Sequence, residues 1–329
     1  MYAARRATIR SASLGGAILA VFAAIAGHAD EAPPLVAPAS SAASTRTAAV
    51  TVDCSAKPIG RVIVATLGNV PIVTLLANGH PVVLLLDTGA ERTVFTPAVA
   101  ERIGAQPPRV EFLRQMQGAA GTLSTREVEL RSFTAGDVAI PWRRVVVASV
   151  TMSTIFSIPL DGFLGADVLS SFDIDLDLPH QQMLLYQKQS CPSAPPWARP
   201  YTAISTGRSR GEHLFFPVQL DGRGVVAFVD TGAQRTLLST TAALALGVTE
   251  AALARDRSIT TRDATAHQLD SRLHRFSRLT VGAEMIRNPE VVVTDVKLTD
   301  ANLVLGIDFL KSRHIWLSYG SHRIFLSSR

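Results

Sequence analysis

Two stretches decide the fold of this chain: PVVLLLDTGA at residues 81–90 and GVVAFVDTGA at residues 224–233. In each, an apolar run ends in Asp-Thr-Gly-Ala, and an Asn-Gly or Asp-Gly turn begins nine residues before the aspartate (87 − 78 and 230 − 221). A run that is apolar on both faces predicts a strand that is buried on both sides. We therefore expect Asp87 and Asp230 at the ends of two buried strands, inside the protein.

The likeness between the two halves continues downstream at nearly fixed spacing. Gly104 and Gly247 each lie 17 residues after the aspartate of their own half (104 − 87 and 247 − 230). Later, two apolar residues precede Gly165 in the first half and Gly306 in the second, 78 and 76 residues after the aspartates (165 − 87 and 306 − 230). Register kept at so many positions indicates a tandem duplication. The many short apolar runs bounded by glycine predict an all-β protein.

Composition agrees with a folded protein of two domains. The chain has 329 residues, of which 47% are hydrophobic and 18% charged, values that exclude a wholly disordered chain. Of its 32 basic residues, three lie in the first 29 residues, which contain no acid; without this segment 29 basic residues face 27 acidic ones. So small an excess does not favour nucleic-acid binding or polybasic membrane attachment.

The chain divides into five segments by composition. Residues 1–29 read as a secretion signal, 30–54 as an Ala/Ser/Pro-rich linker or pro-segment, 55–190 as the first lobe, 191–206 as a Pro-rich linker and 207–329 as the second lobe. We therefore expect an exported protein, periplasmic or secreted, with no stable membrane insertion after signal removal. A retained anchor is the alternative, although the apolar run of the signal is shorter than the about 20 residues that span a bilayer.

The two cysteines, Cys54 and Cys191, flank the first lobe. Export to an oxidising compartment permits a bridge between them, which would join the two ends of that lobe. Two unrelated buried thiols are the alternative. Two cysteines are too few for a cysteine-built zinc site.

The paired Asp-Thr-Gly-Ala motif, each copy answered later by two apolar residues and glycine, resembles the aspartic proteases. It is most similar to the retropepsin-like group, from about residue 55 to 329. The resemblance implies two homologous, closed-barrel-like lobes related by a pseudo-twofold axis, with Asp87 and Asp230 as the catalytic pair. It further implies an endopeptidase that activates a water molecule, acts on a polypeptide substrate and needs neither metal nor cofactor. Because one chain supplies both aspartates, we expect a monomer.

The motif also assigns supporting roles. The residues after each aspartate would shape the active-site loops, and the two later glycines would let a second strand pass close to each loop. The threonines would bond across the junction of the lobes. The loop residues are Thr88, Gly89, Ala90, Thr231, Gly232 and Ala233, and the second-motif glycines are Gly165 and Gly306.

A glycine-bearing stretch about 30 residues after Asp87 resembles the flap that covers the substrate in this family. It runs from Arg114 to Gly121, and Gly118 and Gly121 would supply the flexibility of a lid. The matching residues 260–267 of the second half contain no glycine. We therefore expect one principal flap, from the first lobe.

Other readings of the charged residues explain less. Asp167 and Asp308 follow the second-motif glycines and are expected to begin helices or turns, and Arg92 and Arg235 to form structural ion pairs. The chain has no His-Glu-x-x-His motif for zinc and no Gly-x-Ser-x-Gly elbow. A glycosidase carboxylate pair would not explain the repeated Thr-Gly. The remaining alternative is a catalytically inactive, protease-fold module that binds peptides.

Overall fold

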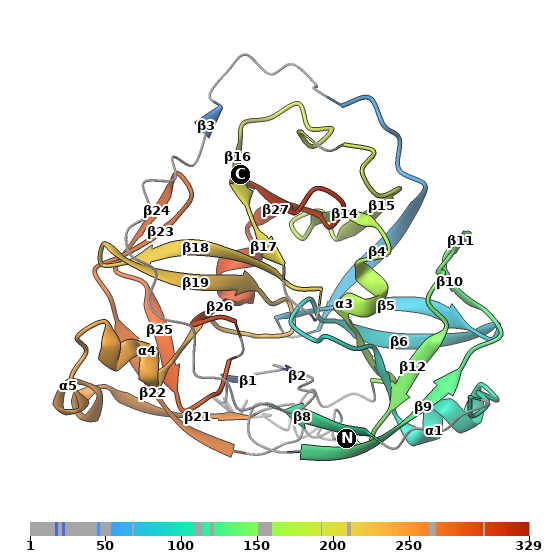
Figure 1. The fold of residues 1–329 in the computed structure, drawn as a ribbon, viewed down its shortest axis with the longest axis horizontal. Helices are drawn as coiled ribbons and strands as arrows, with labels where there is room; N and C mark the ends of the chain where they lie inside the picture. The colour runs from blue at the N-terminus through green and yellow to red at the C-terminus, as the bar shows by residue number, and fades with distance from the viewer. Residues whose placement is uncertain are drawn as a thin grey trace, which may run out of the picture.

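The computed structural model describes residues 54–108, 114–118, 122–150, 160–208, 212–262 and 268–328, without residues 68, 192 and 299. It also describes three two-residue strands nearer the N-terminus, β1 (Ala17–Ile18), β2 (Phe22–Ala23) and β3 (Thr45–Arg46). The elements are mostly strands, which confirms the predicted all-β class, and they form a sheet of 17 strands and one of 11 (Figure 1). The two-lobed fold is confirmed, although the described strands form open sheets and no closed barrel. None of the described helices is long and apolar enough to cross a membrane.

In lobe one, an antiparallel meander leads to Asp87. β4 (Gly60–Leu67) pairs with β5 (Val70–Ala77), and β5 pairs with β6 (His80–Leu86). Asn78 and Gly79, which join β5 to β6, have φ angles of 52° and 81°, the left-handed pair that a tight hairpin requires. The other elements of this lobe are β7 (Val94–Phe95), α1 (Pro97–Arg102), β8 (Arg114–Gly118), β9 (Thr122–Glu129), β10 (Phe133–Ala135), β11 (Val138–Ala139), β12 (Arg144–Val147), β13 (Gly162–Leu164) and α3 (Ala166–Leu169).

Lobe two repeats this arrangement. β18 (Leu214–Leu220) pairs with β19 (Arg223–Val229) across a turn in which Asp221 and Gly222 have φ angles of 50° and 82°. The same local chemistry has thus produced the same hairpin in front of Asp230. The other elements are β17 (Gly207–Arg208), β20 (Leu237–Ser239), α4 (Thr240–Ala245), α5 (Glu250–Arg255), β21 (Arg257–Arg262), β22 (Gln268–Arg275), β23 (Arg278–Val281), β24 (Glu284–Arg287), β25 (Glu290–Thr294), β26 (Leu303–Leu305) and α6 (Ile307–Leu310).

Five further strands form a region shared by both lobes, which we call the interlobe sheet, near the top of Figure 1. They are β14 (Asp173–Asp177), β15 (Gln182–Tyr186), β16 (Tyr201–Ser205), β27 (Arg313–Ser318) and β28 (Arg323–Ser328). β14 follows α3 in lobe one and β27 follows α6 in lobe two, and these equivalent strands pair antiparallel, with Ile174 opposite Leu317. The lobes are therefore joined by backbone hydrogen bonds as well as by the linker.

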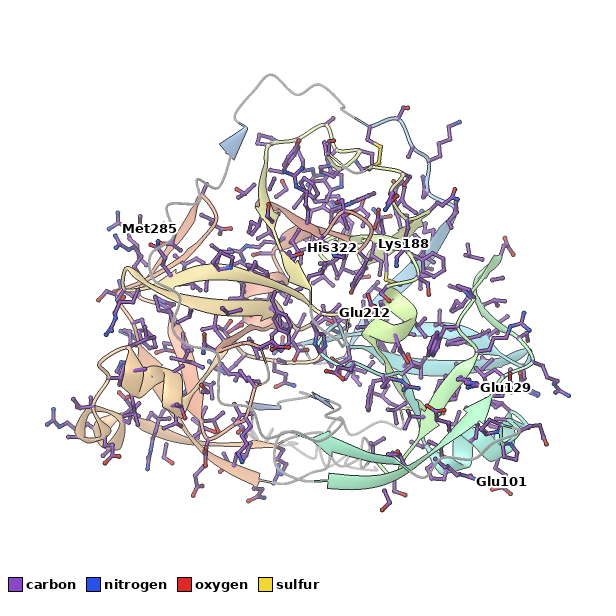
Figure 2. All side chains as sticks on the ribbon, in the orientation of Figure 1. Glu101, Glu129, Lys188, Glu212, Met285 and His322 are labelled. Atoms are coloured by element: carbon purple, nitrogen blue, oxygen red, sulfur yellow. A yellow bond between two sulfur atoms is a disulfide. The ribbon has the colours of Figure 1, made fainter. Side chains whose placement is uncertain are left out.

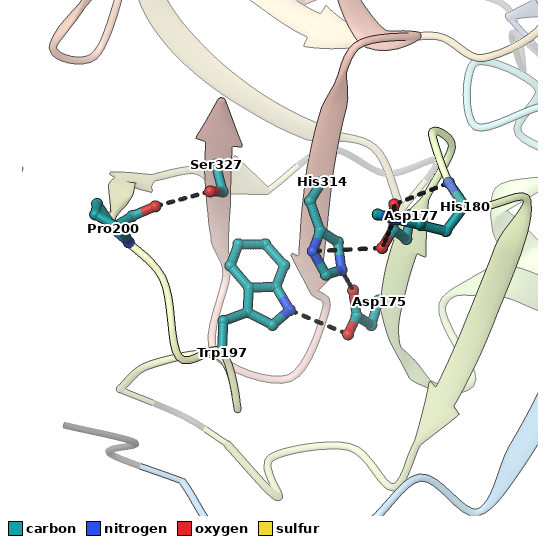
Figure 3. A network of polar contacts seen from close by, with 7 residues as sticks. All are labelled: Asp175, Asp177, His180, Trp197, Pro200, His314 and Ser327. Carbon is teal, nitrogen blue, oxygen red and sulfur yellow. Dashed lines mark hydrogen bonds and ion pairs between the residues drawn. The ribbon is translucent and has the colours of Figure 1, made fainter. Parts of the chain in front are cut away.

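A polar cluster fixes the linker to the interlobe sheet (Figure 3). Asp175 of β14 binds Nε2 of His314 on β27, and it accepts a 3.0 Å hydrogen bond from Nε1 of Trp197 in the linker. The indole lies over the imidazole, with 4.2 Å between ring centroids. Asp177 binds His180 at 2.8 Å and lies 3.8 Å from His314 Nδ1. Both lobes and the linker thus meet at one buried carboxylate, Asp175.

The structure joins Cys54 and Cys191 by a disulfide, with 5.6 Å between their Cα atoms; it appears as a yellow bond in Figure 2. Cys191 is fully buried and packs with Trp197, Trp316 and Phe325. The bridge therefore closes the two ends of lobe one against the interlobe sheet.

Candidate active site

The two aspartates stand at equivalent ends of equivalent strands. Asp87 follows β6, and β13 runs parallel beside it, so that the Asp87 N–H donates to the carbonyl of Leu164 at 3.1 Å. Asp230 follows β19 beside β26, and its N–H donates to the carbonyl of Leu305 at 3.0 Å. The second motif of each repeat thus supplies the strand that holds the aspartate of the same repeat.

The two second-motif glycines lie where no side chain fits. A Cβ atom on Gly165 would lie 2.5 Å from the backbone carbon of Arg92, and one on Gly306 would lie 2.5 Å from that of Arg235. Such distances are far below ordinary van der Waals contact. Both glycines are required because the chain here passes directly against the active-site loop.

The threonines connect the two loops across the lobe junction. The N–H of Thr88 donates to the hydroxyl of Thr231, and the N–H of Thr231 donates to the hydroxyl of Thr88, each at 3.1 Å. The two hydroxyls in turn donate to the carbonyls of Val229 and Leu86. Four buried hydrogen bonds therefore fix the position of one aspartate loop relative to the other.

Only one carboxylate oxygen of each aspartate, Oδ1, accepts hydrogen bonds from its own loop. Oδ1 of Asp87 accepts from the N–H groups of Gly89 and Ala90, both at 3.0 Å. Oδ1 of Asp230 accepts from Gly232 at 2.8 Å and Ala233 at 3.1 Å. The Oδ2 atoms accept no hydrogen bond from a donor group among the described residues. The backbone thus orients both carboxyl groups and leaves one oxygen of each available for chemistry.

Each carboxyl group lies against the active-site loop of the other lobe. A Cβ atom on Gly89 would lie 2.3 Å from Cγ of Asp230, and one on Gly232 would lie 2.7 Å from Cγ of Asp87. Any larger residue at either glycine would enter the space of the opposite aspartate. Two buried carboxyl groups so placed repel each other when both are ionised, and a proton on one of them relieves that repulsion.

The surroundings of the pair favour that proton. Burial and then the Asp230 charge raise the pKa of Asp87 well above its ordinary value. Burial also raises the pKa of Asp230 to about 7, against the opposing hydrogen bonds from the loop N–H groups. Two buried carboxyl groups in contact cannot both ionise cheaply. The surroundings therefore favour a protonated form of the pair over the doubly ionised one.

The second pair of repeated carboxylates is structural, as the sequence indicated. Oδ1 of Asp167 accepts from the N–H and hydroxyl of Thr93, at 2.8 and 2.7 Å, and Asp308 bonds Thr236 in the same way. Arg92 forms ion pairs with Asp167 at 3.2 Å and with Glu127 at 2.8 Å. These contacts fix the short helices behind the active-site loops. Among the described residues, no group of three His, Cys, Asp or Glu side chains could hold a metal ion.

The predicted flap is a hairpin, and lobe two has one as well. β8 and β9 pair antiparallel, with Gln117 opposite Thr122, and Gly118 ends β8; Gly121 lies outside the described residues. In lobe two, β21 and β22 form the equivalent hairpin, on the same lower side of Figure 1. The expectation of a single flap rested on glycine content. Because strand pairing needs no glycine, glycine content could not reveal the second hairpin.

Comparison with protein families agrees with this geometry. A family model described as aspartyl protease matches residues 73–168, and one described as gag-polyprotein putative aspartyl protease matches residues 216–312. Each match contains one Asp-Thr-Gly-Ala motif and its later glycine. No curated protein of significantly similar sequence was found. With one protease domain in each half, the chain belongs to the retropepsin-like aspartic protease family.

Proposed function

We propose that this protein is an aspartic endopeptidase that hydrolyses peptide bonds in exported or envelope proteins. One observation carries the proposal: two buried carboxyl groups, one from each repeat, each lie against the active-site loop of the other lobe, with one oxygen of each bound by backbone N–H groups and the pKa of both raised. This arrangement suits general acid–base chemistry at a peptide carbonyl.

The reaction follows from the shared proton. The ionised carboxylate takes a proton from a water molecule as the water oxygen attacks the scissile carbonyl carbon. The protonated carboxyl group donates to the carbonyl oxygen, which becomes a hydroxyl in the tetrahedral intermediate. When the C–N bond breaks, the leaving nitrogen receives a proton from the pair, and one hydroxyl of the intermediate gives its proton back to the pair as the C=O bond re-forms. The peptide thus gains OH on carbon and H on nitrogen, and the pair returns to its starting state.

The two hairpins favour an extended polypeptide as substrate. Phe22–Ala23 pairs with Gln117–Gly118 of β8, and Ala17–Ile18 pairs with Thr261–Arg262 of β21. The edges of both hairpins are therefore able to accept a further strand, which is the usual way in which a sheet edge binds an extended peptide. Export rests on the basic and apolar features of residues 1–29, and the monomer on the presence of both aspartates in one chain.

The decisive experiment is digestion of a proteome-derived peptide library by the purified protein, read by mass spectrometry. Wild type should generate new termini, and Asp87→Asn and Asp230→Asn should each abolish them, with the double variant scarcely worse because the pair acts as a unit. Asp137→Asn, an exposed carboxylate in a turn of lobe one, is the matched control and should cleave normally. Peptide binding without cleavage by wild type would instead favour the alternative, an inactive binding module.

A further inference from the structure

The two repeats differ at one buried position beside the active site. Val70 and His213 occupy equivalent places, each eight residues before the turn of its hairpin (78 − 70 and 221 − 213). Both are buried. Valine packs there among apolar groups such as Leu85 and Ala90. Lobe two places an imidazole in the same environment, and a buried polar ring needs a reason.

Aromatic side chains hold this imidazole in one orientation. The ring of His213 stacks on Phe228, with centroids 5.2 Å apart and planes 23° apart, and meets Phe215 edge-on at 5.8 Å. The residues equivalent to these phenylalanines in lobe one are Leu85 and Ile72. Lobe two has therefore exchanged an aliphatic group for an aromatic cage around a histidine. Glu212, which precedes the histidine, is labelled near the centre of Figure 2.

The imidazole bonds to the active-site loop of the other lobe. Its partner is the backbone of Gly89, and the bond favours the protonated ring, so the ring N–H donates and the Gly89 carbonyl accepts. Burial lowers the pKa of His213 to about 4. The ring is therefore neutral over the range in which the aspartate pair holds one proton, and it still has one N–H to donate.

The bonded peptide group is the one that orients Asp87. The carbonyl of Gly89 and the N–H of Ala90 belong to the same peptide unit, and that N–H donates to Asp87 Oδ1 at 3.0 Å. A peptide whose carbonyl accepts a hydrogen bond becomes a stronger donor through its N–H. Val70, in the equivalent place of lobe one, has no polar side-chain atom to do the same for the Asp230 loop.

We propose that His213 is a positioning residue, which holds the Gly89–Ala90 peptide against Asp87 and so makes the two halves of the aspartate pair inequivalent. The proposal rests on the proposed peptidase function. The titratable groups around this contact are Asp87 and Asp230 of the pair, and Glu91 and Glu212, which are near Gly89 and His213 in the chain. Tyr319 also belongs to this set, because the charge of Glu212 acts on it.

The test compares variants that keep or remove the donor. His213→Phe preserves the aromatic cage but has no N–H, and it should lower kcat about 2- to 13-fold with little change in KM, the usual effect of losing one such hydrogen bond. His213→Asn, which retains an N–H near the position of Nδ1, should recover most of kcat. Phe276→Leu, a packing change at a buried phenylalanine of lobe two that belongs to another apolar cluster, is the matched control and should keep kcat.

The pH profile separates positioning from packing. Loss of the donor weakens a hydrogen bond that favours ionised Asp87, so the alkaline limb of kcat/KM should move to higher pH in His213→Phe and stay in place in His213→Asn. Wild-type kcat and an unmoved limb in His213→Phe would overturn the inference, as would Asn and Phe variants equally impaired. If His213→Phe does not fold, His213→Val, the residue of lobe one, takes its place. A wild-type protein that cleaves no peptide would refute the peptidase function itself, which these variants do not address.

Discussion

Thr88 and Thr231 each accept a hydrogen bond from the other's backbone N–H at 3.1 Å, across the junction of the two lobes. Their hydroxyls also donate to the carbonyls of Val229 and Leu86. Both side chains are buried, so water cannot replace a partner that is lost. The relative position of the two aspartates therefore depends on two hydroxyl groups.

Replacing either threonine by valine, which keeps the shape, should cost both stability and activity. Thr88→Val leaves the N–H of Thr231 and the carbonyl of Val229 without their partner, at about 1–3 kcal/mol for each buried polar group. Urea unfolding should show a loss on that order, and kcat should fall because the loops shift. Thr88→Ser should behave like wild type, and Thr74→Val, at an exposed position of β5, provides the control. Full stability in Thr88→Val would contradict this account of the junction.

The aspartate pair should make the folded protein less stable as pH rises. The pKa of each group is raised on folding, so the folded state binds more protons than the unfolded state above pH about 4, and stability falls from there until the pair has titrated. The free energy of unfolding lost across this range is on the order of 4 kcal/mol for Asp230, whose pKa rises from 3.8 to about 7. Asp230→Asn should therefore unfold at higher temperature than wild type at pH 7.5, with the difference shrinking towards pH 4.

Thermal unfolding of both proteins at several pH values checks this prediction. Asp137→Asn, at an exposed turn, should follow wild type throughout. A stabilisation in Asp230→Asn that is the same at pH 4 and pH 7.5 would show that the effect does not come from the proton of the pair.

How far the sequence predicts this structure depends on how local each signal is. The hairpin before Asp87, its buried strand and the close passage of Gly165 follow from residues that are adjacent in the chain or repeated in register. The pairing of β14 with β27 joins Ile174 to Leu317, and no local pattern specifies a partner so distant. His213 was missed for another reason: it interrupts the repeat where the first half has Val70, and only a comparison of all positions in the two repeats would have found it.

The disulfide should stabilise the protein without contributing to catalysis. It closes a loop with a sequence separation of 137 residues, which is worth about 5 kcal/mol in the chain-entropy model. The double variant Cys54→Ser/Cys191→Ser should unfold at a lower temperature, while its kcat below that temperature stays close to wild type. Non-reducing peptide mapping of the purified protein should recover the Cys54–Cys191 pair. Two freely alkylatable thiols would contradict the bridge.

The residue after each Asp-Thr-Gly is expected to affect the pH at which the aspartate pair loses its proton. Ala90 and Ala233 are fully buried and pack in apolar clusters, and each contributes to the pair only its backbone N–H, to Oδ1 of its own aspartate. A serine here would add a hydroxyl that can donate to the carboxylate. Because the alanines offer no such donor, the shared proton is held to higher pH, in the same direction as the effect of burial and of the Asp230 charge on the pKa of Asp87.

Activity requires the shared proton, so kcat/KM should be highest at mildly acidic to neutral pH and should fall as the proton is lost. In the double variant Ala90→Ser/Ala233→Ser, the added donors favour the ionised carboxylates, which lowers the pKa of the pair and moves the alkaline limb to lower pH. Ala100→Ser, at a buried position of α1 away from the aspartates, controls for the burial of a hydroxyl. The measurement is kcat/KM against pH for the three proteins. An alkaline limb that stays in place or moves upward in the double variant would show that these alanines do not set the pH range of the pair.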